Sequence, residues 1–268
     1  MLMKTKPKEE QVIDLATVDS VSRRKFLRQA ITGAVTVMLV YGVPAAARHG
    51  RGKGWKQMSQ QHQYAYSIDI NKCIGWGGCV RACQEENNLT EDQFRTWIER
   101  YVLTEDGVYV DSPKGGAEGF QPVTDEILSK AHRAFFVPKM CNHCENPPCV
   151  QVCPVGATFK DPEGFVLIDH EHCIGCANCV QACPYGARFF NHEIGMSDKC
   201  TWCYHRVKRG QLPACVEACP TGARQFGDLL EPDSALSKLY RENQWMVLKP
   251  ETHTAPTCFY ISLPREVV

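Results

Sequence analysis

The chain has 268 residues, and its 30 basic and 30 acidic side chains leave a formal net charge of zero. This balance excludes the strongly positive surface typical of a nucleic-acid-binding protein, so we expect no nucleic-acid partner. The 16 cysteines are the compositional outlier, and their spacing decides what class of protein this is.

The N-terminus has the pattern of an export signal. The twin-arginine motif S-R-R-K-F-L-R at residues 22–28 is followed by an apolar stretch, 30–43, and by the small residues Pro44-Ala45-Ala46-Ala47. We predict a twin-arginine signal peptide over residues 1–47 and a flexible, Gly- and Lys/Arg-rich leader over 48–63. The apolar stretch is shorter than the about 20 residues of a membrane span, which favours a cleaved signal. An uncleaved membrane anchor is the alternative. The expected location is the periplasm, reached through the twin-arginine export machinery.

The first elements after the leader surround the first of four cysteine groups. Alternation from Tyr64 to Ile70 predicts a short strand, and residues 80–86 read as the start of a short helix. The segment CIGWGGCVRACQ, residues 73–84, follows the strand and runs into this helix; its cysteines are Cys73, Cys79 and Cys83. An insertion, 89–137, follows; we expect a strand at 94–103, a loop at 106–119 and a short helix at 126–132.

The next three groups repeat one theme. The third group, CIGCANCVQACP, has the spacing C-x2-C-x2-C-x3-C-P, in which three thiolates bind one cubane and the fourth binds a second one. The second and fourth groups lengthen one gap but keep the opening C-x2-C and the closing C-x3-C-P. Each closing cysteine begins the sequence C-P-x-G-A, where proline redirects the chain and glycine permits a tight passage. The cysteines are Cys141, Cys144, Cys149 and Cys153; Cys173, Cys176, Cys179 and Cys183; and Cys200, Cys203, Cys215 and Cys219.

The first group departs from this pattern at one position. It aligns with the third group residue by residue, and Trp76 stands where the second cysteine is expected. Tryptophan replaces a ligand and cannot bind iron, so we expect its indole to pack on an incomplete cluster. Three thiolates suit a [3Fe–4S] cluster; a [4Fe–4S] cluster with an outside ligand and an empty site are the alternatives.

Residues 228–268 form a C-terminal extension that we expect to dock a partner. Residues 232–243 read as a helix capped by Asp233 or Ser234, and 244–249 and 258–263 as short strands. Cys258 stands outside every group and reads as a buried free thiol.

Other uses of the cysteines fit less well. Structural zinc sites pair two C-x2-C units and need no C-x3-C-P, and disulfide scaffolds are small domains. No C-x-x-C-H occurs, which excludes haem c attachment. An autonomous enzyme would need a dinucleotide loop or a catalytic metal motif, and neither is present. Six basic residues lie near the groups, where they could raise cluster potentials or dock a partner; for any single one of them we favour a solvated surface position. They are Arg188, Lys199, Arg206, Lys208, Arg209 and Arg224.

From about Tyr64 to Gly227 the chain resembles the four-cluster iron–sulfur subunits of complex molybdenum oxidoreductases, such as the electron-transfer subunits of dimethyl sulfoxide, polysulfide, thiosulfate and tetrathionate reductases. The phrase Trp97-Ile-Glu-Arg-Tyr is also similar to the periplasmic ferredoxin of the Dsr membrane complex. The resemblance implies an α+β fold of doubled two-cluster ferredoxin-like domains with insertions over residues 64–227, in which groups one and four pair and groups two and three pair.

The resemblance also implies three [4Fe–4S] ligand sets and one incomplete set. In the nitrate-reductase relative a tryptophan replaces a cysteine of the third group, whereas here it lies in the first, so the direction of electron flow does not carry over. The implied sets are Cys141, Cys144, Cys149 and Cys183; Cys153, Cys173, Cys176 and Cys179; Cys83, Cys200, Cys203 and Cys215; and, for [3Fe–4S], Cys73, Cys79 and Cys219.

The implied function is a non-catalytic relay of single electrons. It would connect an integral-membrane, quinone-reactive subunit with a molybdopterin catalytic subunit or a multihaem cytochrome in anaerobic respiration, and the chain would associate with the membrane through that partner. The alternative is a three-cluster relay, or a structural assembly subunit, with the first site empty.

Overall fold

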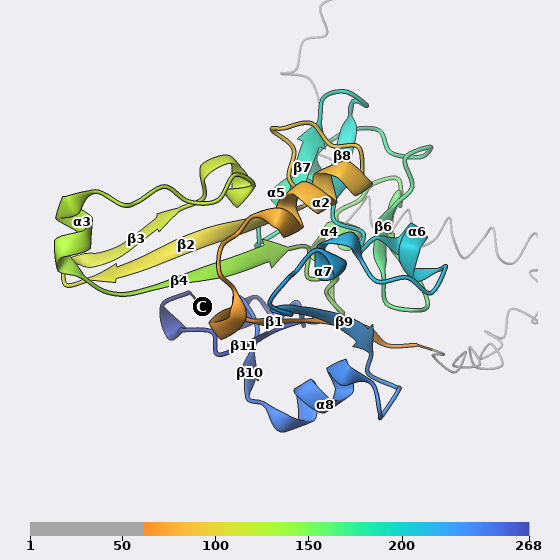
Figure 1. Cartoon of the computed structure of the whole chain (residues 1–268). Helices are drawn as coiled ribbons and strands as arrows, with labels where there is room; N and C mark the ends of the chain where they lie inside the picture. Colours follow the sequence, from red (N-terminus) through yellow and green to blue (C-terminus); the bar gives the residue numbers. More distant parts are fainter. Residues whose placement is uncertain (1–61, 268) are drawn as a thin grey trace, which may run out of the picture. The chain divides into compact units, whose positions relative to one another are not determined.

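A computed structural model of the chain describes residues 62–267 (Figure 1). The predicted signal peptide and residues 48–61 of the leader lie outside this part. Helices and strands alternate along it, which confirms the α+β class. The helices are α2 (Gly78–Glu86), α3 (Asp125–Lys130), α4 (Pro148–Gln151), α5 (Asn178–Gln181), α6 (Tyr204–Val207), α7 (Ala214–Glu217) and α8 (Ala235–Glu242). The strands are β1 (Tyr64–Asp69), β2 (Thr96–Thr104), β3 (Gly107–Asp111), β4 (Ala131–Met140), β5 (Thr158–Lys160), β6 (Val166–Ile168), β7 (Arg188–Asn191), β8 (Met196–Lys199), β9 (Arg224–Asp228), β10 (Trp245–Met246) and β11 (Cys258–Ile261).

The largest sheet joins the two ends of the described chain in the order β10-β11-β1-β9. Strand β1 pairs antiparallel with β9 and parallel with β11, so β1 has neighbours on both edges. Its residues Ala65 to Ile68 are buried on both faces, as expected of a strand covered on both sides. Helix α8 packs against β9 and β1, and the Ser234 hydroxyl caps it by accepting from the Ser237 N–H. The C-terminal residues are thus part of the same sheet as β1.

A second sheet, in the order β3-β2-β4, projects as a long arm (Figure 1). Strand β2 confirms the strand expected over 94–103. The loop expected over 106–119 is wrong for residues 107–111, which form β3 and close a two-residue turn against β2. The helix expected over 126–132 ends two residues early, because β4 begins at Ala131 and pairs with β2 along its whole length.

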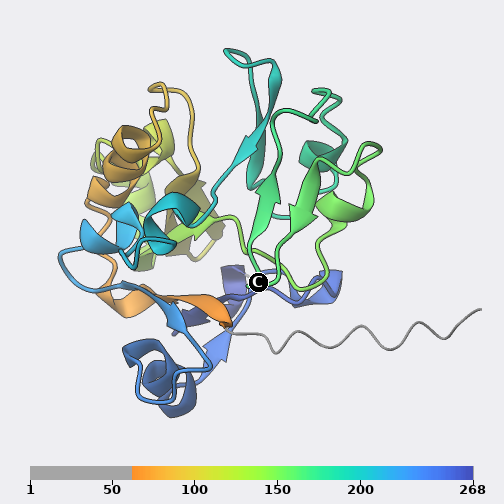
Figure 2. The same ribbon diagram turned by 90° about the vertical axis from the view of Figure 1, so that its right-hand side faces the viewer.

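Two small hairpins connect the cysteine groups (Figure 2). Strands β5 and β6 lie between groups two and three, and β7 and β8 lie between groups three and four. Each group also contains helix: α2 in group one has nine residues, and α4, α5, α6 and α7 in the other groups have four each. Two helix pairs pack together, α2 with α7 and α4 with α5. This packing brings group one beside group four and group two beside group three.

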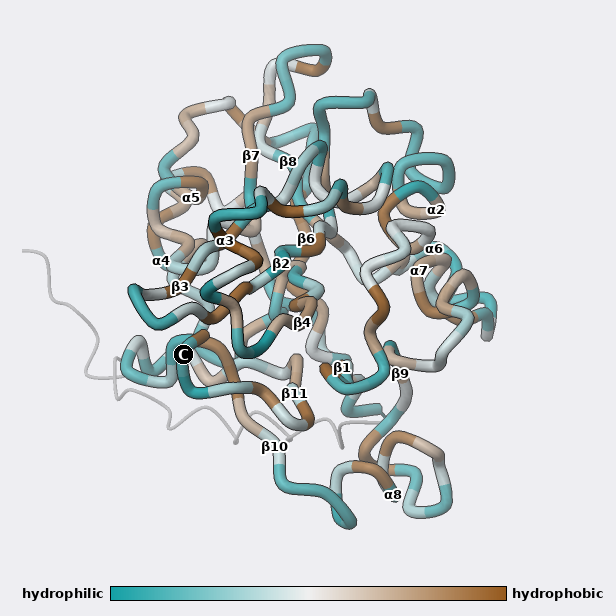
Figure 3. The backbone as a smooth tube through the Cα atoms, turned by 60° about the vertical axis from the view of Figure 1, so that its left-hand side comes forward, coloured by the Kyte–Doolittle hydropathy of each residue, from teal (hydrophilic) through white to brown (hydrophobic). Residues whose placement is uncertain are grey.

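Hydropathy varies over short stretches along the whole described chain (Figure 3). Within residues 62–267 no helix is both long enough and apolar enough to span a membrane. The core instead gathers aromatic side chains between the cysteine loops, with Tyr66, Phe165 and Trp202 fully buried and packed on one another. The apolar core is therefore built around the cysteine groups.

Candidate functional site

The four cysteine loops share one backbone feature. The second residue after each opening cysteine has a positive φ: +70° at Gly75, +42° at His143, +68° at Gly175 and +54° at Trp202. Glycine adopts this conformation freely, whereas histidine and tryptophan there cost about 1–2 kcal/mol each. The loop containing Trp76 therefore has the same turn as the cysteine-complete loop of group three.

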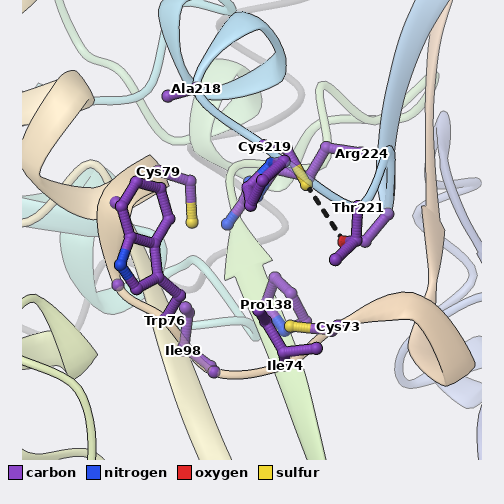
Figure 4. Close-up of a pocket in the computed structure, with 15 residues that line it drawn as sticks. Cys73, Ile74, Trp76, Cys79, Ile98, Pro138, Ala218, Cys219, Thr221 and Arg224 are labelled. Carbon is purple, nitrogen blue, oxygen red and sulfur yellow. Dashed lines mark hydrogen bonds between the residues drawn. The ribbon is translucent and has the colours of Figure 1, made fainter.

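Trp76 lies at the rim of a cavity and leaves the interior open (Figure 4). The cavity has an empty volume of about 320 Å³, and the thiols of Cys73, Cys79 and Cys219 line it. The indole is 52% exposed and covers Gly78, where an added Cβ would lie 2.0 Å from the ring. The structure thus brings together the three cysteines of the expected incomplete set and places the tryptophan beside them.

A second cavity, also with an empty volume of about 320 Å³, lies between groups two and three. The thiols that line it are those of Cys141, Cys144, Cys149 and Cys183. A cavity lined by cysteine thiols is therefore present both beside Trp76 and between groups two and three.

The third expected set meets at the contact between α2 and α7. Cys83 is buried, and this burial together with the nearby thiols of Cys200, Cys215 and Cys203 raises its pKa well above the usual value. The remaining expected set is Cys153, Cys173, Cys176 and Cys179. Helix α5, which contains Cys179, packs on α4, and Cys153 follows α4 in the chain. Cys173 and Cys176 lie in the loop before α5, and Cys176 is exposed to solvent.

The C-P-x-G-A segments wrap backbone around the closing thiols. Burial alone would raise the pKa of Cys153, but N–H groups of residues 155–158 point at its sulfur and lower it. The same balance, with N–H groups of Thr221, Ala223 and Arg224, lowers the pKa of Cys219. Such a nest of N–H groups stabilises a thiolate, which explains why proline and a positive-φ glycine recur here.

Loops two and four brace each other through a reciprocal pair of hydrogen bonds. The Trp202 indole N–H donates to the Cys141 carbonyl at 3.1 Å. The Val166 N–H donates to His143 Nδ1, so Nε2 carries the proton and donates to the Cys200 carbonyl at 3.0 Å. The two rings stack with centroids 4.2 Å apart. His143 is thus a structural link between two cysteine loops.

Three of the six basic residues expected on solvated surface are instead buried. Arg188, Lys199 and Arg224 lie among the cysteines, so the surface interpretation is wrong for them. Cys258 is buried, as expected; burial raises its pKa to about 12.

The donor set suits a multinuclear cluster. Within residues 62–267 no three His, Cys, Asp or Glu side chains converge closely enough to bind a single metal ion, because the thiols are spread around cavities. Burial raises the pKa of Cys144 to about 12 and that of Cys203 to about 11, so cluster binding must release protons from these thiols. Soft thiolates at this spacing are the ligands that iron–sulfur clusters require.

Comparison with known proteins agrees with the geometry. Residues 132–229 match the family model of the 4Fe-4S dicluster domain, and residues 70–87 match that of the 4Fe-4S binding domain. The chain is 41% identical to a tetrathionate reductase subunit of Salmonella typhimurium, over 90% of this chain and 88% of that protein. It is 42% identical to the corresponding tetrathionate reductase subunit of Archaeoglobus fulgidus, over 85% of this chain and 96% of that one. It is 34% identical to the arsenate respiratory reductase iron-sulfur subunit of a Shewanella species, over 72% of this chain and 94% of that one.

The cysteine loops, the cavities between them and these relatives lead to one conclusion. The chain belongs to the family of ferredoxin-type iron–sulfur subunits of complex molybdenum oxidoreductases, and it is an electron-transfer subunit rather than a catalytic one.

Proposed function

We propose that the chain relays single electrons through three [4Fe–4S] clusters and one [3Fe–4S] cluster. Each cluster, when bound, supplies reversible one-electron chemistry at a potential set by its type, charge, hydrogen bonds and exposure. The proposed ligand sets are those named above, with Cys73, Cys79 and Cys219 holding the [3Fe–4S] cluster beside Trp76. The packing of α2 on α7 and of α4 on α5 supports two paired halves, the doubled ferredoxin arrangement.

The observation that carries this proposal is the gradient of exposure along the sets. In the proposed series the inner two sets are the one that contains Cys83 and the one that contains Cys183. Seven of their eight cysteines are buried, and Cys183 is half-buried. The outer two sets reach the surface, where Cys176 and Trp76 are exposed and Cys73 is half-buried. Sites open at both ends and enclosed in the middle suit a relay that exchanges electrons with a different partner at each end.

The proposed partners are those that the resemblance to the family implies. The relatives are named as subunits of tetrathionate, arsenate and other reductases. This supports a quinone-reactive integral-membrane subunit at one end and a molybdopterin catalytic subunit or a multihaem cytochrome at the other. We place the protein in the periplasm, membrane-associated through its partner, with residues 228–268 contributing to docking.

Protein-film voltammetry tests the relay directly. Anaerobically purified protein adsorbed on a carbon electrode should give reversible one-electron waves at more than one potential, and protein stripped of iron should give none. Irreversible waves, or waves unchanged after iron removal, would contradict a relay and favour a structural assembly subunit.

A further inference from the structure

Arg188, Lys199 and Arg224 are buried cations without acidic partners. Their exposed fractions are 4%, 0% and 1%. In the described part of the chain no carboxylate forms an ion pair with any of them. A fully buried Lys or Arg normally requires a compensating negative charge, so these three need another source of it.

Arg224 lies between two of the proposed cluster sites. Its Nη2 donates to the Thr96 hydroxyl at 2.9 Å, while its buried Nη1 has no acceptor. The side chain lines the cavity beside Trp76 (Figure 4). The groups that act electrostatically on its guanidinium are the Cys79 thiol, which lines that cavity, the Tyr66 hydroxyl, and the Cys215 thiol, which belongs to the neighbouring set.

Arg188 repeats this arrangement in the other half. Its Nη1 donates to the Thr158 hydroxyl at 3.3 Å, and its buried Nη2 also has no acceptor. It lines the second cavity with Cys141 and Cys149, and the thiols that act electrostatically on it are those of Cys149, Cys141 and Cys179, the last from the set on the other side of the α4–α5 contact. Arg188 and Arg224 directly follow the C-P-x-G-A segments 183–187 and 219–223. Thr158, which accepts from Arg188, follows the remaining segment, 153–157.

Lys199 occupies the position between the two halves. Its Nζ donates to the Cys200 carbonyl at 2.8 Å. The groups that act electrostatically on its charge are the thiols of Cys141 and Cys149, from the second cavity, the thiol of Cys200, from the adjoining set, and the like-charged guanidinium of Arg188. One buried cation therefore lies at each step of the proposed series of sites.

We propose that these three residues place one fixed positive charge between each successive pair of clusters, and that the free N–H groups of Arg188 and Arg224 donate to cluster sulfur. This inference rests on the proposed function. The cations are positioning residues: each electron that enters a site leaves it for the next, and the guanidinium groups are neither oxidised nor deprotonated. Positive charge and N–H···S bonds stabilise the reduced state, so each cation raises the potential of the two clusters beside it.

The test is a potentiometric titration followed by electron paramagnetic resonance, with iron content measured on every sample. Arg224→Gln should shift the reduction equilibrium of the Trp76-side cluster and its neighbour at least tenfold toward the oxidised state, which is 59 mV for one electron. Arg188→Gln should shift the other pair and leave the first pair unchanged. Arg224→Lys, which keeps the charge, should shift the same signals less than threefold.

Arg209→Gln is the matched control, because Arg209 is exposed beside group four and its charge is screened by solvent. Potentials unchanged in both buried-site variants, or shifted equally by Arg209→Gln, would overturn the inference while the iron content and signals of the parent still supported the relay. A parent protein without clusters would instead sink the proposed function.

A second measurement needs no variant. Protein labelled with ¹⁵N only in the arginine guanidinium groups should show ¹⁵N couplings to the paramagnetic clusters in pulsed resonance experiments. Absence of these couplings in iron-loaded protein would overturn the N–H···S assignment.

Discussion

At the scale of single residues, Trp76 removes one thiolate ligand from the first site but leaves the backbone of the loop unchanged. Its loop has positive φ at Gly75 and Gly77, and the third loop has positive φ at Gly175 and Ala177, the matching positions. The cavity behind Trp76 keeps three thiols and stays open. The residue change therefore removes one ligand from a site whose backbone remains suited to a cluster.

Because only one ligand is missing from the first site, we predict that Trp76→Cys converts it to a [4Fe–4S] site. A fourth thiolate at residue 76 would complete C-x2-C-x2-C, so iron content should rise from about 15 to about 16 per protein and the oxidised-state [3Fe–4S] signal should disappear. Trp76→Ser, which cannot supply a thiolate, should keep that signal. A persistent signal in the cysteine variant would show that residue 76 does not control cluster type.

At the scale of elements, the cysteine loops stabilise one another through contacts that local sequence does not reveal. Strand β1, helix α2, helix α8 and strand β11 follow from alternation, caps and periodicity. Strand β4 was missed because Pro138 interrupts its pattern; the position is tolerated because β4 lies at the edge of the order β3-β2-β4. The positive φ values of His143 and Trp202 could not be predicted, because neither position is a glycine.

The loop bracing predicts a specific loss of stability. Trp202→Phe removes the N–H that satisfies the buried Cys141 carbonyl, at a cost of about 1–3 kcal/mol. We expect the visible absorbance of the clusters to bleach about five- to 100-fold faster in guanidinium chloride, since each 1.4 kcal/mol corresponds to a factor of about ten. Trp245→Phe, at an exposed tryptophan, should bleach at the parent rate. Equal rates for all three proteins would contradict the bracing role.

An ion pair between elements makes a second prediction. Arg95 on the segment before β2 contacts Asp198 on β8 at 2.9 Å and also donates to Asn87, whose amide N–H₂ reaches the Cys83 carbonyl at 2.8 Å. Asp198→Ala would leave a largely buried cation uncompensated, a loss of about 3–5 kcal/mol. Iron retention during dialysis against a chelator should fall, with the cluster held by Cys83 lost first. Lys130→Ala, which breaks an exposed pair with Asp106, should retain iron normally.

At the scale of the whole molecule, the sequence and the structure contribute different parts of the account. Cysteine spacing alone predicts cluster chemistry, whereas the gathering of Cys73 and Cys79 with the distant Cys219 was implied by resemblance and is placed in one cavity by the fold. The burial of Arg188, Lys199 and Arg224 could not be predicted, because a basic residue near a cysteine group is expected on the surface until tertiary packing is known. Burial of charge here makes sense only beside anionic groups.

Export by the twin-arginine route is a prediction about the motif at residues 22–28. Replacing Arg23 and Arg24 by lysine should leave iron-loaded protein in the cytoplasm, because the twin-arginine pair is the expected address. Lys25→Gln, at the variable position of the motif, should be exported normally. Fractionation with cytoplasmic and periplasmic markers decides the matter, and periplasmic recovery of the double-lysine variant would contradict the expected route.

The central claim is a four-site relay whose first site, beside Trp76, holds the odd cluster. Electron paramagnetic resonance of anaerobically purified protein, oxidised and then reduced, with an iron count, tests it most directly. A four-site relay should give a sharp oxidised-state [3Fe–4S] signal, coupled cubane signals on reduction and about 15 irons per protein. No oxidised-state signal with about 12 irons would mean that the cavity lined by Cys73, Cys79 and Cys219 is empty and would contradict the four-site relay.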